Sequence, residues 1–83
     1  MSNEERATYR EILRLSDLLR ESRPGVSLLL GADEVGLQAV GVQEYEVGGW
    51  RRLIPLSSDF EEVRRRLGDM VAQELAKRDQ LAF

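Results

Sequence analysis

The sequence predicts an α+β fold in a single domain, with the element order helix, strand, strand, strand, helix. Three observations lead there. Apolar residues recur at helical spacing near both ends of the chain, β-compatible apolar runs lie between them, and capping or turn residues mark the boundaries. A chain of 83 residues is too short for two independent cores, so residues 1–83 are expected to form one domain. The natural arrangement is a three-stranded antiparallel meander with both helices on one face.

The first helix is expected from Asn3 to Ser22. Ser2 and Glu5 have the spacing of a capping box, in which two side chains satisfy free backbone amides at a helix start. The residue before a proline disfavours helical geometry, so Arg23-Pro24-Gly25 should end the helix. Its core face is predicted to consist of Ile12, Leu15 and Leu19, bordered by Tyr9 and Leu13 on one side and by Leu18 on the other.

Two strands should follow, Val26–Leu30 and Val35–Val47, separated by turn residues. Gly48-Gly49 can adopt positive φ at both positions of a two-residue type I′ turn, which predicts a tight hairpin into a third strand that ends near Pro55. A two-residue loop would set Glu46 opposite Arg51 across the hairpin.

The second helix is predicted to start at Ser58, which forms a second capping box with Glu61. Glu74 falls inside its apolar stripe, where an unpaired carboxylate would be costly. Three resolutions are open: a pair with Arg78, a helix end that extends past the sheet into solvent, or contact with a second subunit. The stripe itself consists of Phe60, Val63, Leu67, Met70, Val71 and Leu75.

Strict alternation leaves apolar residues on both faces of the sheet, and two explanations carry equal weight. Either a β-bulge near Gly41 switches the alternation, or a second copy of the chain covers the open face. The second explanation gives a self-association surface, to which the apolar C-terminal tail could contribute. Its predicted residues are Val40, Val42, Leu53, Leu81 and Phe83.

The sequence predicts no enzyme, cofactor or metal site. It contains neither histidine nor cysteine, which removes the usual bases, nucleophiles and thiolate ligands. Glu44 and Glu46 share a strand face, as an acid and base pair would, but an open sheet offers them no obvious pocket. Asp33 and Glu34 lie in a turn without the alternating oxygen ligands of a calcium loop.

The expected function is that of a non-enzymatic regulator or inhibitor that occupies a surface of a protein partner and self-associates as a homodimer. A phage or mobile-element inhibitor, an antitoxin-like regulator and a chaperone are objects of this type. The alternative is a nucleic-acid-binding regulator that uses a basic row on the first helix, although the net charge of −3 argues against it. The predicted partner-binding residues are Arg6, Arg10 and Arg14 of that row, and Tyr45, Trp50 and Arg52.

The expected location is the cytoplasm. Residues 1–10 carry charges and no apolar stretch, unlike a secretory signal, and no segment has the length and apolarity of a membrane span.

Overall fold

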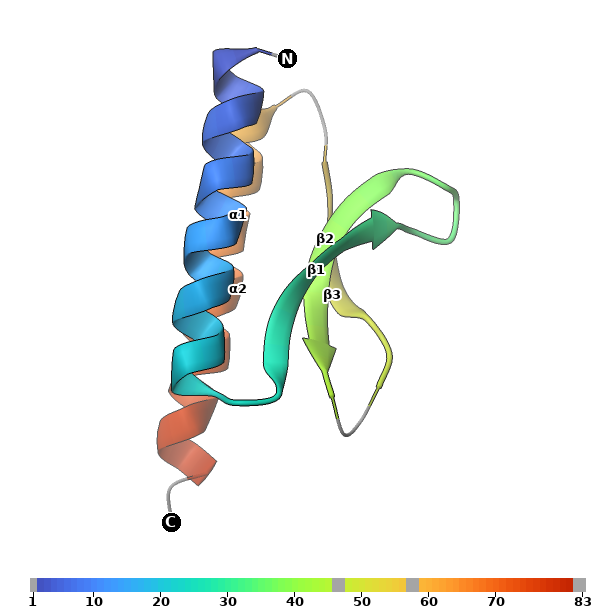
Figure 1. The fold of residues 1–83 in the computed structure, drawn as a ribbon. Coiled ribbons are helices and arrows are strands. Elements are labelled where there is room, and N and C mark those ends of the chain that lie inside the picture. Colours follow the sequence, from blue (N-terminus) through green and yellow to red (C-terminus); the bar gives the residue numbers. More distant parts are fainter. Residues whose placement is uncertain (1, 46–47, 57–58, 82–83) are drawn as a thin grey trace.

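A computed structural model describes residues 2–45, 48–56 and 59–81 of the chain (Figure 1). It confirms the predicted α+β class and element order. A three-stranded antiparallel sheet in the order β1-β2-β3 packs against two helices. The elements are α1 (Asn3–Ser22), β1 (Val26–Ala32), β2 (Gln38–Glu44), β3 (Arg51–Pro55) and α2 (Phe60–Leu81).

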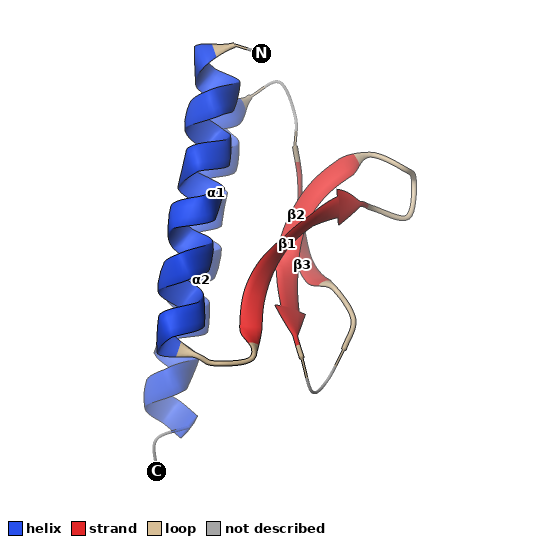
Figure 2. Ribbon diagram, in the orientation of Figure 1, coloured by secondary structure: helices blue, strands red, loops and turns tan. Residues whose placement is uncertain are grey.

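The two helices form one layer and the sheet forms the other, so one face of the sheet is covered by helices (Figure 2). Both helices run in the same direction, side by side. Near their first turns Arg64 of α2 reaches α1, where it donates to the Thr8 hydroxyl at 3.0 Å and pairs with the Glu4 carboxylate at 2.8 Å.

Helix α1 has the predicted bounds, and its predicted cap is present, since the Ser2 hydroxyl accepts the Glu5 amide at 3.1 Å. Ser58, the predicted cap of α2, lies outside the described residues. The carboxylate of Asp59 accepts the Glu62 amide at 3.2 Å and supplies a cap instead.

The core lies between the helices and the inner face of the sheet. The centres of both predicted helical stripes enter it, which confirms the 3.6-residue periodicity. The predicted borders Leu13 and Leu18 are 66% and 38% exposed, and Phe60 does not belong to the buried cluster. The buried cluster comprises Ile12, Leu15, Leu19, Val26, Leu28, Val40, Val42, Ile54, Val63, Leu67, Met70 and Val71.

Strand β2 begins at Gln38, three residues later than predicted. The cause is Asp33, whose carboxylate accepts the backbone amides of Val35 at 3.0 Å and Leu37 at 2.9 Å. These bonds close the β1–β2 turn and take the backbone of residues 34–37 out of the ladder.

The predicted register between β2 and β3 is wrong, because Arg51 lies opposite Val42, four residues before its predicted partner Glu46. Gly48 and Gly49 do have positive φ, at 74° and 77°, as predicted. The chain departs from a tight hairpin at Trp50, whose indole crosses the outer face of the sheet and donates to the Leu29 carbonyl at 3.1 Å. Glu46 lies outside the described residues.

A β-bulge at Gly41 is confirmed. Ladder pairs join Val40 to Ile54 and Val42 to Arg51, so two residues of β3, Arg52 and Leu53, lie opposite one residue of β2. The extra residue allows Ile54 to share a face with Val40.

That shared face is the helix-covered one, which corrects the predicted self-association surface. Val40 and Val42 have no exposed surface and belong to the core, so they are unavailable to a second copy of the chain. Leu53, half-buried on the outer face, stays a prediction. The side chains of Leu81 and Phe83 lie outside the described residues.

Replacing Gly41 by alanine should destabilise the fold by about 1–3 kcal/mol, because the added Cβ would lie 2.5 Å from Trp50 Nε1 and 2.8 Å from Leu53 Cδ2. Gly68 of α2 is the matched control: a Cβ there meets nothing within 4 Å, so alanine should stabilise by about 0.5–1 kcal/mol. Urea unfolding measures both free energies. Equal effects of the two substitutions would contradict the close packing over Gly41.

Candidate functional site

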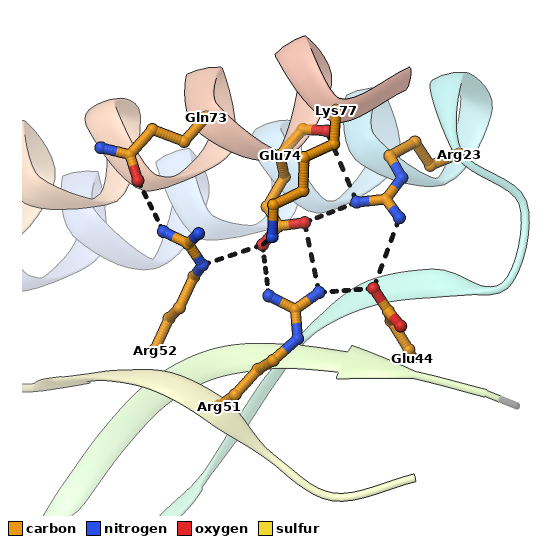
Figure 3. Close-up of polar contacts among 7 residues, drawn as sticks. All are labelled: Arg23, Glu44, Arg51, Arg52, Gln73, Glu74 and Lys77. Atoms are coloured by element: carbon orange, nitrogen blue, oxygen red, sulfur yellow. Dashed lines mark hydrogen bonds and ion pairs between the residues drawn. The ribbon is translucent and has the colours of Figure 1, made fainter. Parts of the chain in front are cut away.

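The densest polar cluster of the described residues surrounds Glu74, whose side chain has no exposed surface (Figure 3). Arg23 approaches one carboxylate oxygen at 2.5 Å, and Arg51 approaches the other at 2.5 Å. Arg52 and Lys77 lie 3.1 Å and 3.4 Å from the oxygen that Arg51 also contacts. We call these five residues, together with Glu44, the Glu74 cluster.

Glu44 closes the cluster from the end of β2. Its carboxylate oxygen lies 2.5 Å from Arg51 and 3.3 Å from Arg23, so both arginines bridge the two carboxylates. Four cationic side chains against two carboxylates leave a formal excess of two positive charges.

Each element contributes to the cluster for a local reason. Arg23 is the C-cap of α1, where the chain turns toward β1. The β-bulge brings two successive residues of β3, Arg51 and Arg52, toward α2, although a regular strand would send them to opposite faces.

Arg52 has φ of 57°, a left-handed conformation that costs a non-glycine residue about 1–3 kcal/mol. Its contacts across to α2 offset that cost: it donates to the Gln73 amide oxygen at 2.5 Å and lies beside Glu74.

The electrostatics keep Glu74 ionised at neutral pH. Burial acts to raise the pKa of Glu74, but the hydrogen bond from Arg51, and then the charges of Arg51 and Lys77, outweigh burial and hold this pKa below its ordinary value. The same hydrogen bond with Glu74 raises the pKa of Arg51. The cluster therefore presents fixed charges that hold four segments together.

The Glu74 side chain has no exposed surface, which excludes the predicted solvated helix end, and its described partners belong to the same chain. Contact with a second subunit stays a prediction. The side chain of Arg78 lies outside the described residues. The position of Glu74 within an apolar stripe was the sequence signal for an unusual carboxylate. Its partners could not be found from sequence because they depend on the β-bulge and on the register of β3.

The three arginines of the basic row of α1, Arg6, Arg10 and Arg14, are exposed. Arg14 also forms a surface ion pair with Glu11, and its hydrogen bond lowers the pKa of that glutamate. The structure does not bring this row together with Tyr45, Trp50 or Arg52, which lie at the sheet.

The three predicted partner residues of the sheet differ in their surroundings. Tyr45 is 88% exposed. The Trp50 ring packs over Gly41 and Gly31, so packing on the sheet accounts for much of its surface. Arg52 is held by Gln73 and Glu74 and serves the cluster.

Two surface pockets border these residues. One, of about 440 Å³, lies beside Tyr45 and is also lined by Arg20, Gly25, Val26, Ser27 and Gln43. The other, of about 300 Å³, lies between β3 and α2 and includes Arg52, Arg65, Arg66 and Asp69.

Within the described residues, no three or more histidine, cysteine, aspartate or glutamate residues are grouped as a metal site. Asp33 instead closes its turn, as described above.

Neither helix, over its described length, offers the long apolar stretch that crossing a membrane would require. Comparisons with protein-family models, curated proteins and solved structures gave no match to this chain.

Replacing Glu74 by glutamine should lower the free energy of unfolding by about 1–3 kcal/mol, because it leaves four partly exposed cations without their shared counter-charge. A chain of this length has about 4–12 kcal/mol in total, so the loss is large. Asp69→Asn is the control, since Asp69 pairs with Arg65 on the surface and should cost less than about 1 kcal/mol. Equal losses in urea unfolding would contradict a structural role for the cluster.

The stabilisation from Glu74 should depend on pH. A carboxyl group whose pKa is lowered on folding stabilises the folded state fully above its ordinary value of 4.5, and the stabilisation is lost as the pH falls through the folded pKa. The other groups that face Glu74 in the cluster are Arg23, Arg51, Arg52 and Lys77, with Glu44 bound to two of the same arginines.

The difference in unfolding free energy between the wild type and Glu74→Gln should therefore be constant above about pH 5 and shrink toward pH 3. A difference that stays unchanged down to pH 3 would refute the lowered pKa.

Proposed function

We propose that this chain is a non-enzymatic regulator that binds a protein partner and acts by occupying its surface, with Tyr45 and the adjoining pocket as the contact site. The observation that carries the proposal is the exposure of Tyr45. An aromatic side chain left 88% exposed loses the burial that normally stabilises it in a fold, and aromatic residues dominate the binding energy of protein interfaces.

The surroundings of Tyr45 suit a preformed contact. Its backbone amide donates to the Gly25 carbonyl at 2.7 Å, which fixes the end of β2 beside the start of β1. The ring adjoins a pocket of about 440 Å³ with both apolar and polar lining residues, among them Val26 and Gln43. A partner side chain could enter this pocket without reordering the backbone, which reduces the entropic cost of binding.

The structural role of the acidic residues Glu44 and Glu74 also favours a binding function over catalysis. Glu44 and Glu74 accept hydrogen bonds from arginines that tie α1, the sheet and α2 together. A general acid needs a pKa near the working pH, whereas the pKa of Glu74 is shifted downward, away from neutrality.

Nucleic-acid binding through Arg6, Arg10 and Arg14 is the alternative, and the exposure of Arg6 and Arg10 is the observation in its favour. The ion pair of Arg14 with Glu11 and the net negative charge count against it. It predicts binding that weakens steeply with salt and is lost in an Arg6→Glu, Arg10→Glu variant.

Tyr45→Ser should abolish capture of the partner from an extract of the source cells, or weaken it at least about tenfold, as expected for an interface hot spot. Val35→Ser is the matched control, because Val35 is 82% exposed in the β1–β2 turn and does not line the pocket. Quantitative mass spectrometry of the captured proteins measures the effect. If both variants retain the same proteins as the wild type, the Tyr45 surface is not the contact site.

A further inference from the structure

Among the strands that the structure describes, β1 pairs only with β2, so one edge of β1 is free. The Tyr45 amide donates to Gly25 and the Asp33 amide donates to Leu37, so the odd-numbered residues of this segment turn their backbone groups toward β2. Backbone groups alternate in direction along an antiparallel strand. Those of Leu28, Leu30 and Ala32 therefore point away from the sheet, and we call them the β1 edge.

The β1 edge is unsatisfied in the described part of the chain. Outside the ladder, no backbone hydrogen bond there involves Leu28, Leu30 or Ala32, whereas the Val26 amide already donates to the Arg23 carbonyl at 3.0 Å. Figure 1 shows β1 with α1 on the near side of the molecule, and no segment crosses in front of them.

The other edge of the sheet, strand β3, is protected against pairing with a further strand, whereas β1 is not. Strand β3 carries a bulge, a charged residue in a left-handed conformation at Arg52, and Pro55, all of which discourage pairing with another strand. Strand β1 reads Val-Ser-Leu-Leu-Leu-Gly-Ala, with no charge and no proline. Leu29 and Leu30 on it are 40% and 45% exposed.

We propose that two copies of this chain pair through their β1 edges, antiparallel, about a two-fold axis at Leu30. This alignment uses all three residues with free backbone groups: Leu30 faces Leu30 of the second copy, and Leu28 faces its Ala32. The result is a continuous six-stranded sheet with four helices on one face.

The side chains favour a second copy over another occupant. The same alignment sets Leu29 opposite Gly31 of the second copy, and the Cβ position of Gly31 lies 3.2 Å from the Trp50 ring. Leu29 of each copy thus meets a residue without a side chain, beside an indole that adds apolar surface. Strand β1 carries no charged residue, so it can pair with an equally uncharged strand without burying a charge. It offers no charged side chain that would bind an acidic or a basic peptide.

Helix α1 extends the contact. An α-helix has 3.6 residues per turn, so nine residues make two and a half turns. Leu13, nine residues after Glu4, therefore lies on the flank of α1 opposite to the one that contacts Arg64. It is 66% exposed there, on the flank of α1 that faces away from α2. A second copy would therefore find apolar surface on β1 and on α1. The pairing does not depend on the proposed function, because Val26 and Ser27 of the Tyr45 pocket precede the paired segment.

Charge substitution at Leu30 tests the two-fold axis. Leu30→Lys and Leu30→Glu each set like charges opposite one another and should weaken dimerisation at least about tenfold in sedimentation equilibrium. A mixture of the two variants should form heterodimers, since opposite charges then meet. Val35→Lys, with its charge in the exposed turn, should dimerise like the wild type.

Far-ultraviolet circular dichroism and Trp50 fluorescence establish that each variant is folded. A separate measurement does not need these variants: because the chain contains no cysteine, Leu30→Cys can be oxidised alone. It should form a disulfide-linked dimer, as residues paired across a ladder lie about 5.5 Å apart at Cα. Val35→Cys should not. A wild type that stays monomeric at all accessible concentrations, a dimer that Leu30→Lys does not weaken, or a mixture without heterodimers would overturn the proposal.

Discussion

The ion pairs around Glu74 are the interaction on which the arrangement of this fold depends. A carboxylate without exposed surface can remain charged only if cations come to it, and here they come from the end of α1, from β3 and from α2 itself. Glu44 at the end of β2 binds two of the same arginines. The apolar core holds the helices against the sheet, and the Glu74 cluster specifies how they are aligned.

This requirement explains the irregular geometry of β3. A regular strand could direct only one of Arg51 and Arg52 toward α2, and a regular strand with Arg51 on that face would turn Ile54 away from the core. The bulge opposite Gly41 resolves both conflicts, at the cost of a left-handed Arg52. It also brings Leu53 against Gly41 on the outer face, beside the Trp50 ring, so there is no room for a side chain at residue 41.

The helices could be predicted from sequence because their signals are local. The bounds of α1, the apolar stripes and the bulge at Gly41 follow from caps, 3.6-residue spacing and a glycine within a strand. The register of β3 could not be predicted, because the favourable turn geometry of Gly48-Gly49 competes with the burial of the Trp50 ring on a distant strand. The partners of Glu74 depend on that register, and so does the correct placing of Val40 and Val42 in the core.

The parallel course of α1 and α2 has an electrical consequence. Peptide dipoles of antiparallel helices largely cancel, whereas those of parallel neighbours add, with the positive pole at the amino ends and the negative pole at the carboxyl ends. Acidic residues occupy both first turns, as Glu4 and Glu5 in α1 and Glu61 and Glu62 in α2. The cationic surplus of the Glu74 cluster begins at Arg23, the carboxyl end of α1. Side-chain charge thus compensates the backbone dipoles at both ends of the helix pair, so the parallel packing of α1 and α2 leaves little uncompensated charge at either end.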